Sequence, residues 1–377
     1  MLETSFKPIG LDRERLTDLI KSHDLDGIFF SSPENVFYTT GYPCLPGSGN
    51  PIIYALRNQL PFISFAGKDG SMTLLCWAQA SMGIDYGTDD VRSFFTYDTA
   101  LAEMTTFVEE KLKPSCKLGV DSTFPYFFLQ ILNEHVKPKS VVVVDEIILD
   151  LQLIKSAEEI ERIRKSTLII DKTVMELADA LHPGMSRLEL IQEAKARLHS
   201  NGANGVDHIT VAFGQANPEI ALDETLEANQ IVTLDLGAIY EGYVSDNRRL
   251  VYTGKVPDAL KELHKKLCWV VAEMGNALRP GTTFGELHAH AFKLYEKVGV
   301  EPMFLHVGHS IGLHVDERWL MADDPTVIQI GMVLNIELYS FSDEAVMIGD
   351  EETFVVKDGG AEKLSTLPVD IIERIFS

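Results

Sequence analysis

Acidic residues and one histidine lie inside segments that are otherwise apolar. An unpaired carboxylate in a buried strand costs several kcal/mol, so such groups normally have a metal ion, a cation or several hydrogen-bond donors beside them. Four carboxylates and one imidazole form an oxygen-rich set that suits Mn, Co, Fe or Zn and argues against a thiolate-bound structural zinc. Two such ions, roughly 3.5–4 Å apart, would activate a bridging hydroxide and polarise a carbonyl, so the set predicts hydrolysis. The expected ligands are Asp235, Asp246, His309, Glu337 and Glu351.

The first two carboxylates lie on an expected β-hairpin. Apolar runs over 231–240 and 244–252 are separated by a short turn that contains Gly242, which predicts two antiparallel strands. Asp235 and Asp246 can therefore meet across one hairpin. Either residue alone is as readily explained by a turn cap or a wet sheet face, but the pair, together with three further ligands, favours a metal site.

The other three ligands come from later segments. His309 is flanked by glycines, Glu337 is a single carboxylate within an apolar strand, and Glu351 lies between two further acidic residues. Those neighbours, Asp350 and Glu352, are alternative final ligands. His309 alone would be better explained as a core histidine bonded to backbone, and its four carboxylate partners reverse that preference.

These segments resemble the pita-bread metallopeptidases, which include methionine aminopeptidase, aminopeptidase P and prolidase, with creatinase as a relative without metal. The resemblance covers nearly the whole chain and is carried by motifs at 235–246, 308–313, 331–337 and 351–353. The spacing of fourteen residues between the two Glu ligands resembles the prolidase pattern and favours Glu351 as the final ligand.

The resemblance also implies a role for each ligand. Asp235, Asp246 and Glu351 would be anionic ligands, with at least one carboxylate bridging two divalent ions. His309 would bind as a neutral imidazole whose second nitrogen faces an acceptor. Glu337 would be a ligand and would also take the proton from the nucleophilic water.

The N-terminal part is expected to be a separate α/β domain. A Ser-x-x-Glu capping box at Ser156 opens a long helix, which predicts a boundary near 150–156 and domains of 1–152 and 153–377. The first domain alternates strand-like and helix-like runs. Residues 35–41 and 153–160 resemble the N-domain signature and the junction of prolidases and aminopeptidase P. The expected strands are 27–30, 71–77 and 141–144, and the expected helix is 101–112.

The second domain contains an internal repeat. The segment 181–190 recurs ninety-seven positions later as 278–287, and each copy ends one helix with Pro-Gly and opens the next with a capping box. Two copies predict a duplicated half-domain whose halves share a cleft. The expected fold is therefore a creatinase/prolidase-like α/β domain followed by an α+β pita-bread domain with pseudo-two-fold duplication.

Composition narrows the class of protein. The chain has 377 residues and a net charge of −23, which disfavours nucleic acid and anionic membranes as partners. It has no long apolar span and no signal-like N-terminus, so a cytoplasmic location is expected. Its four cysteines show no metal-type spacing and are expected to be free thiols. The resemblance suggests a homodimer, with Tyr38, Tyr42 and 43–51 as candidates for closing the partner's cleft.

The sequence departs from the prolidase pattern around the ligands. Prolidase-like enzymes place one histidine in the loop that is here 215–224 and another at position 316, where this chain has Asp316. An arginine expected at 349 is Gly349, and a glycine expected after the ligand histidine is Ser310. Losing an oxyanion-stabilising donor commonly costs about 10²–10³ in rate. His314, His306 or His208 could take over the role of a missing donor. Asp316, an acceptor in place of an imidazole donor, is expected with Glu337 and His314 among the catalytic residues.

Three hypotheses follow. The first is a metal-dependent Xaa-Pro dipeptidase or aminopeptidase acting on dipeptides or short peptides. The second is a hydrolase or lyase of a small non-peptide substrate, like creatinase or ectoine hydrolase, favoured by Glu219, Asp223 and Asp316 near the expected cleft. The third is a silent binding protein, which is disfavoured because idle buried carboxylates destabilise a fold.

Overall fold

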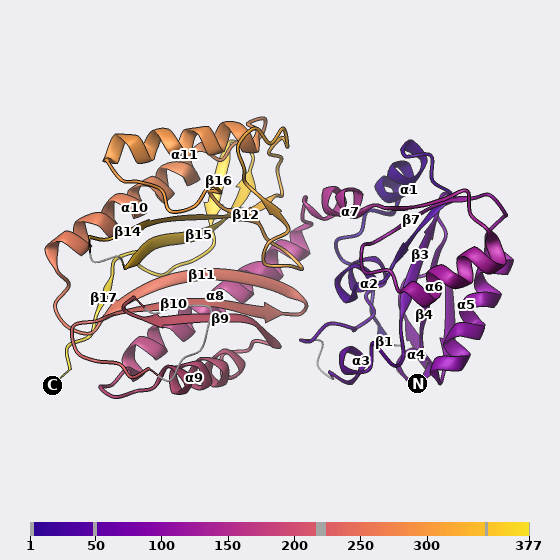
Figure 1. Cartoon of the computed structure of the whole chain (residues 1–377), viewed down its shortest axis with the longest axis horizontal. Helices are drawn as coiled ribbons and strands as arrows, with labels where there is room; N and C mark the ends of the chain where they lie inside the picture. Colours follow the sequence, from indigo (N-terminus) through magenta and orange to yellow (C-terminus); the bar gives the residue numbers. More distant parts are fainter. Residues whose placement is uncertain (1–3, 48–50, 216–223, 344–345, 377) are drawn as a thin grey trace. The chain divides into compact units, whose positions relative to one another are not determined.

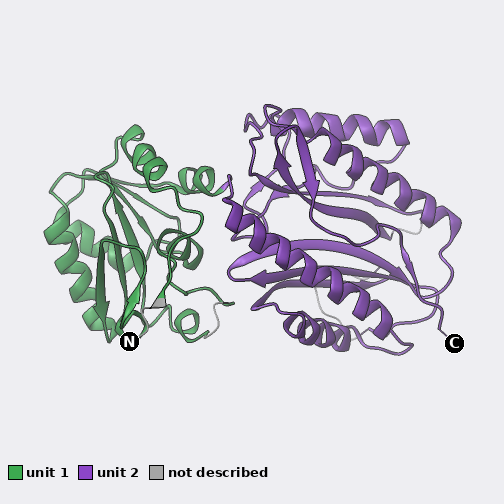
Figure 2. Cartoon of the chain, turned by 180° about the vertical axis from the view of Figure 1, so that it is seen from behind, with its two compact units in different colours: residues 1–152 green, residues 153–377 purple. Residues whose placement is uncertain are grey.

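The computed structural model describes residues 4–47, 51–215, 224–343 and 346–376. The chain forms two compact units, Met1–Gln152 and Leu153–Ser377, which are coloured separately in Figure 2.

Unit 1 is built around a six-stranded mixed sheet with the order β6-β4-β3-β2-β7-β8 (Figure 1). The expected strands and the expected helix all form, each within a few residues of its predicted ends. The strands are β2 (Gly27–Phe30), β3 (Ile63–Gly67), β4 (Met72–Trp77), β6 (Asp90–Phe94), β7 (Lys117–Val120) and β8 (Ser140–Val143), and a separate pair is β1 (Thr4–Ser5) with β5 (Ile84–Asp85).

Helices surround this sheet and complete the α/β layers. Phe29 and Phe65 on the sheet pack against Phe107 of the expected helix in one apolar core. The helices are α1 (Arg13–Ser22), α2 (Pro33–Thr40), α3 (Ile52–Ala55), α4 (Ala78–Ser81), α5 (Tyr97–Lys111), α6 (Tyr126–Ile131), η1 (Leu132–Val136) and α7 (Asp145–Gln152).

Two tyrosines of unit 1 are not surface groups, contrary to the role expected for them. Tyr38 is 3% exposed and its hydroxyl donates to the carbonyls of Gly10 and Leu151. Tyr42 is fully buried and packs against Phe62. Their side chains therefore stabilise unit 1 itself, and part of the accompanying segment lies outside the described residues.

Unit 2 contains two sheets, and each is covered by its own pair of helices (Figure 1). The first sheet has the order β17-β11-β10-β9 and packs against α8 and α9, and the second has the order β13-β12-β14-β15-β16 and packs against α10 and α11. The first half contains α8 (Ala157–Ala180), α9 (Arg187–Ser200), β9 (Gly205–Phe213), β10 (Ile231–Tyr240) and β11 (Tyr243–Tyr252). The second contains α10 (Asp258–Ala277), α11 (Phe284–Val298), β12 (His309–Ser310), β13 (Arg318–Trp319), β14 (Val333–Phe341), β15 (Met347–Lys357) and β16 (Gly360–Lys363), and β17 (Ile372–Glu373) then joins the first sheet.

The predicted duplication is visible at the helix starts. Capping boxes form at Ser186 before α9 and at Thr283 before α11, the two positions that the sequence repeat aligns. A third forms at Ser156 before α8, where the second unit begins. Each half therefore has the same order of helix, helix and antiparallel strands, as a duplicated half-domain requires.

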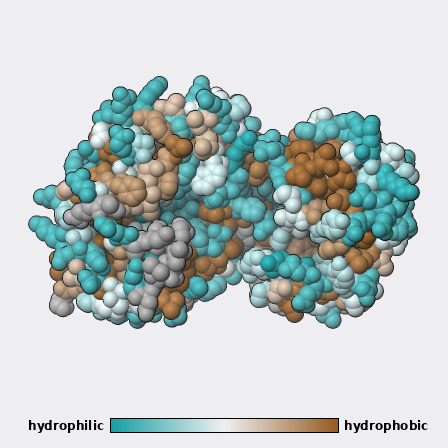
Figure 3. Space-filling view, in the orientation of Figure 1, coloured by the Kyte–Doolittle hydropathy of each residue, from teal (hydrophilic) through white to brown (hydrophobic). Residues whose placement is uncertain are grey.

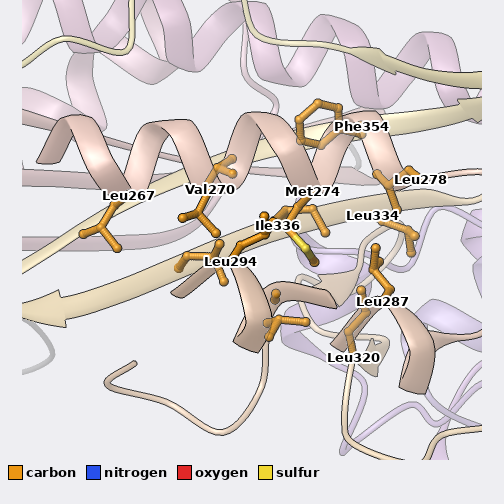
Figure 4. Packing of buried hydrophobic residues seen from close by; sticks show 14 of the residues in the cluster. Leu267, Val270, Met274, Leu278, Leu287, Leu294, Leu320, Leu334, Ile336 and Phe354 are labelled. Carbon is orange, nitrogen blue, oxygen red and sulfur yellow. The ribbon is translucent and has the colours of Figure 1, made fainter. Parts of the chain in front are cut away.

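Alternating residues of the strands separate a helix-facing core from a polar inner face. Leu334 and Ile336 of β14 pack with Met274 of α10 in the core drawn in Figure 4. Because successive strand residues point to opposite faces, Glu337 must point away from these helices. The same parity holds in β10, where Leu234 and its even-numbered neighbours lie in the core under α8 and α9.

The surface of each unit in Figure 3 is largely hydrophilic, with brown apolar patches that are plainest on unit 1. Apolar side chains exposed on this unit include Val142 and Val143 of the edge strand β8. Within the described part of the chain, none of the helices is both long and apolar enough for a membrane span.

Candidate metal centre

Strand register brings the four predicted carboxylates to the inner faces of the two sheets. Asp246 pairs with Gly237 across β10 and β11, so Asp235 lies diagonally from it on the same face. Glu337 and Glu351 are direct register partners across β14 and β15. We call these four residues, together with His309, the carboxylate cluster.

Asp246 is shared by two groups of metal-ligating side chains. One group is Asp246 with His208 and Asp235, and the other is Asp246 with His309 and Glu351. Within each group the ligand atoms lie within 4.8 Å of one another. One carboxylate common to two three-residue groups is the arrangement that a pair of bridged ions requires.

The environment of Asp246 fits a metal centre. Its carboxylate is buried, and Oδ1 accepts no hydrogen bond from the described residues, although Nε2 of His208 lies 3.2 Å away. A buried anionic oxygen without a donor is costly unless a cation is bound to it. The donor set, four carboxylates and imidazole nitrogen, suits Mn, Co, Fe or Zn.

His309 is oriented as a ligand would be. Its Nε2 lies 3.7 Å from Asp246 and 3.9 Å from Glu337, whereas Nδ1 lies 3.3 Å from the backbone carbonyl of Ser310. The loop after this histidine is held by Glu317, which accepts from the amide of Leu313 and forms a buried ion pair with Lys155. The carbonyl therefore fixes the ring, and the ion pair fixes the loop.

Burial and mutual repulsion perturb the ionisation of the cluster. Burial raises the pKa of Glu337 to about 7. Burial, and then the charges of Asp246 and Asp235, hold the pKa of Glu351 well above its usual range. Burial also raises the pKa of Asp235. The pKa of Asp246 is lowered because His208 and His309 outweigh the opposing effect of burial. Divalent cations would favour the ionised form of all four.

Glu337 has the contacts of a proton acceptor. Its Oε2 accepts a hydrogen bond of 3.0 Å from the Tyr339 hydroxyl, and Oε1 lies 3.2 Å from Nδ1 of His306. Burial, and then His309, lower the pKa of His306 to about 4, so this imidazole is neutral. His306 packs between the rings of Phe304 and Trp319.

The alternative final ligands point away from the cluster. Asp350 and Glu352 flank Glu351 on β15 and lie on its opposite, helix-facing side. Glu352 forms ion pairs there with Arg249 at 2.7 Å and Lys363 at 3.1 Å. Of the three acidic neighbours, Glu351 is therefore the one that faces Glu337.

A buried arginine lies beside the cluster. Arg248 is 2% exposed, and its guanidinium lies 3.9 Å from Asp235 and 4.8 Å from the centre of the Tyr339 ring. It places one permanent positive charge among the carboxylates. The charge of a single guanidinium does not neutralise four ionised carboxylates, so their remaining negative charge can attract divalent cations.

Comparison with known proteins identifies the family. The profile of metallopeptidase family M24 matches residues 161–358, and that of the creatinase/prolidase N-terminal domain matches 13–154. The chain belongs to metallopeptidase family M24. Its fold is accordingly a creatinase N-terminal domain followed by a pita-bread catalytic domain, as the sequence predicted. This family implies a dinuclear metal centre.

Prolidases and related peptidases are similar over nearly the full length of this M24 chain. The Xaa-Pro dipeptidase of Pyrococcus furiosus is 28% identical over 94% of this chain and 98% of its own length. The prolidase structure from Pyrococcus horikoshii has a TM-score of 0.80 at 24% identity, covering 94% of this chain and 98% of that one. The X-Pro aminopeptidase structure from Thermotoga maritima has a TM-score of 0.78 at 23% identity, covering 96% and 99%.

Gly349, where the resemblance led us to expect arginine, is explained by its neighbour. A Cβ at this position would lie 1.9 Å from Cδ1 of Tyr339, so the tyrosine ring occupies the space that a side chain at 349 would need. The positive charge comes instead from Arg248, on β11 of the other half. The candidate metal centre of this M24 chain therefore has Arg248 and Tyr339 as polar neighbours of its candidate ligands.

The other predicted residues are less closely tied to the cluster. Asp316 is exposed, yet partial burial raises its pKa. The charge of His309 lowers this pKa and the charge of Asp246 raises it. His314 is exposed, and no side-chain contact joins it to the cluster among the described residues. The catalytic roles of both stay predictions. Glu219 and Asp223 lie outside the described residues.

Three residues of the centre go beyond what the sequence predicts. His208 was considered only as a substitute donor, whereas it shares a ligand group with both aspartates. Arg248 and Tyr339 were not predicted. Each lies two positions after a predicted ligand on a strand, and the two-residue period of strands could have placed them on the same face.

Proposed function

We propose that this M24 protein is a dinuclear-metal-dependent hydrolase of the Xaa-Pro dipeptidase type, cleaving the bond before proline in dipeptides or short peptides. The observation that carries the proposal is the sharing of Asp246 by two ligand groups. The similarity to Xaa-Pro dipeptidases over almost the whole of both chains supports the substrate class.

The chemistry supplied by two divalent ions at this centre is polarisation of a carbonyl and activation of water at neutral pH. Manganese and cobalt suit the oxygen-rich donor set, with zinc and iron as alternatives. Asp235, Asp246, His309, Glu337 and Glu351 would hold the ions, and His208 is a further nitrogen donor on the Asp235 side.

The chain's own groups account for proton transfer and binding. Glu337 takes the proton of the attacking water, and the Tyr339 hydroxyl at 3.0 Å orients its carboxylate. Phe304 and Trp319, each more than a third exposed beside His306, offer apolar faces against which a pyrrolidine ring can pack. Asp316 would bind a cationic group, such as a substrate amino end.

A second candidate is hydrolysis of a small non-peptide amide or amidine. The observation that favours it is the changed polar set, in which Arg248 and Tyr339 occupy the region of the arginine expected at 349. A buried guanidinium beside Asp235 would bind an anionic group of a compact substrate.

The test is hydrolysis of a panel of Xaa-Pro dipeptides by metal-stripped protein reloaded with Mn, Co or Zn. Matched Xaa-Ala dipeptides measure proline selectivity, and Glu337→Gln removes the proton acceptor. We expect metal-dependent cleavage that prefers proline and falls by about 10²-fold or more in Glu337→Gln. Full metal binding without cleavage of any dipeptide would reject the dipeptidase and leave the non-peptide substrate as the candidate.

A further inference from the structure

A second group of metal-ligating side chains lies on the helix-facing side of β15, away from the carboxylate cluster. It consists of His264 and Cys268 on α10 and Asp350 on β15. The candidate ligand atoms of these three residues all lie within 4.8 Å of one another. His264 and Asp350 are buried, and Cys268 is half-buried.

Helix geometry and close packing hold the three residues together. His264 and Cys268 are four residues apart on α10, so they lie on one face of the helix. Gly275, seven residues further on, allows α10 to approach β15 closely, because a Cβ there would lie 2.5 Å from the ring of Phe354. Figure 4 shows Phe354 against this helix. Asp350 lies on the same side of β15 as Phe354, four residues earlier, and so faces the turn of α10 that carries Cys268.

One oxygen of the Asp350 carboxyl group is left without a hydrogen bond. Asp350 is 2% exposed, and its Oδ2 has no hydrogen-bond partner among the described residues. The nearby Arg249 pairs with Glu352 at 2.7 Å and also donates to Ser365 and to the carbonyl of Pro368. Leaving this buried oxygen bare is costly when the carboxyl group is ionised, and a bound cation would remove that cost.

The distance between the thiol and the imidazole is short enough for both to bind one ion. The sulfur of Cys268 lies 3.6 Å from each ring nitrogen of His264. A zinc ion with ordinary Zn–S and Zn–N bond lengths separates its two ligand atoms by about the same distance in a tetrahedron. A sulfur equally distant from both nitrogens faces the ring, so the His264 side chain must turn to direct one nitrogen at the ion. Without an ion the Cys268 thiol donates a weak hydrogen bond to the carbonyl oxygen of Val369, at 3.8 Å. A thiolate, a carboxylate and a neutral imidazole would together balance the charge of a divalent ion.

We propose that His264, Cys268 and Asp350 form a mononuclear site for a thiophilic divalent ion such as Zn²⁺, distinct from the dinuclear centre. Asp350 and Glu351 are consecutive residues whose side chains lie on opposite faces of β15. An ion on the helix side therefore ties α10 to the strand that carries a ligand of the dinuclear centre. Its role is structural, because the three ligands are packed between the helix and the sheet.

Cobalt distinguishes the two kinds of site. A thiolate ligand gives Co²⁺ an intense near-ultraviolet charge-transfer band, whereas the carboxylate cluster and His208 contain no sulfur. The whole metal-stripped chain is titrated with Co²⁺ while this band and the metal content are measured. We expect the wild-type chain to show the band. We also expect it to bind one more metal ion per chain than the Cys268→Ser variant. The band should be absent from Cys268→Ser and from His264→Gln.

Matched variants separate this site from other possible sources of the charge-transfer band. Cys116→Ser removes a buried thiol of unit 1 and should keep the band. Asp235→Asn weakens the dinuclear centre and should also keep it, so failure of the proposed hydrolase and failure of this site are distinguishable. A folded wild-type chain that binds Co²⁺ without the band, or a band that survives in Cys268→Ser, would overturn the proposal.

Discussion

Glu337 on β14 lies directly opposite Glu351 on β15, and the hydroxyl of Tyr339 is 3.0 Å from the first carboxylate and 3.3 Å from the second. Like charges placed opposite each other across a sheet are destabilising. Glu351 is buried and only 12% of the Glu337 side chain is exposed, so the pair is stable only when protonated or when cations lie between the strands. Metal binding, protonation and stability are therefore linked in this protein.

The first prediction concerns the pH dependence of stability without metal. The pKa of Glu337 is about 7 in the folded chain, compared with 4.5 for an ordinary glutamate, so the folded state binds more protons between these values. The contribution of this residue to stability must then fall as pH rises through that window, by on the order of 3 kcal/mol. His306 and His264, whose pKa values burial lowers to about 4, contribute in the opposite direction below pH 6.5. Urea unfolding of chelator-treated protein at pH 5, 6, 7 and 8 measures the slope.

Saturating divalent metal should reverse this trend, because bound ions favour the ionised ligands. Glu352, whose pKa burial also raises to about 7, faces away from the cluster and contributes with and without metal. The difference between the two pH profiles therefore isolates the cluster. Parallel profiles with and without metal would contradict the assignment of Glu337 as a ligand.

The second prediction concerns metal stoichiometry. Because Asp246 belongs to both ligand groups, Asp246→Ala should weaken the binding of both ions at the dinuclear centre. His208→Ala removes a residue of one group and should weaken only one ion. Metal analysis after equilibrium dialysis measures both variants, with His314→Ala as an exposed-histidine control. Equal losses in Asp246→Ala and His208→Ala would contradict the shared role of Asp246.

The third prediction concerns the packing of Gly349 against Tyr339. Gly349→Ala forces a Cβ to within 1.9 Å of the tyrosine ring, and such overpacking typically costs about 1–3 kcal/mol. Tyr339→Ala removes the obstructing ring. The loss of unfolding free energy in the double variant should therefore be smaller than the sum of the two single losses, by about 1 kcal/mol or more. Denaturant unfolding of the four proteins measures the coupling, and strict additivity would show that the ring does not fill this space.

The fourth prediction rests on the proposed dipeptidase activity. Asp316 stands where the resemblance led us to expect a histidine, so Asp316→His would restore a donor near the reacting carbonyl. We expect kcat for Xaa-Pro dipeptides to rise about tenfold or more, since such donors contribute about 10²–10³. Asp316→Asn is the matched control for loss of charge. A fall in kcat in both variants, with metal content unchanged, would show that the carboxylate itself is required.

Much of the fold was predictable because it depends on local patterns. The hairpin of β10 and β11, the capping box at Ser156 and the repeated boxes at Ser186 and Thr283 are all formed as predicted. Each involves residues a few positions apart, or a strand period that shows directly in the order of apolar and polar residues. The five expected cluster residues also lie together. They could be recognised because each is a charged or polar group within an apolar strand or a glycine-flanked loop.

Side-chain neighbours that are far apart in the sequence could not be predicted in this way. The position of Arg248 beside Tyr339, and of Cys268 beside Asp350, depends on how a strand or helix of one segment packs against another segment about ninety residues away. No short spacing in the sequence encodes such a distance.

The sequence by itself determined which residues could bind metal and which strands and helices carry them, since residue type and local periodicity are properties of short segments. Only the tertiary structure decided that Glu351 rather than Asp350 or Glu352 faces Glu337, and that Asp246 is common to two ligand groups. Strand register and helix packing make those decisions, because both depend on the burial of apolar surface summed over the whole unit.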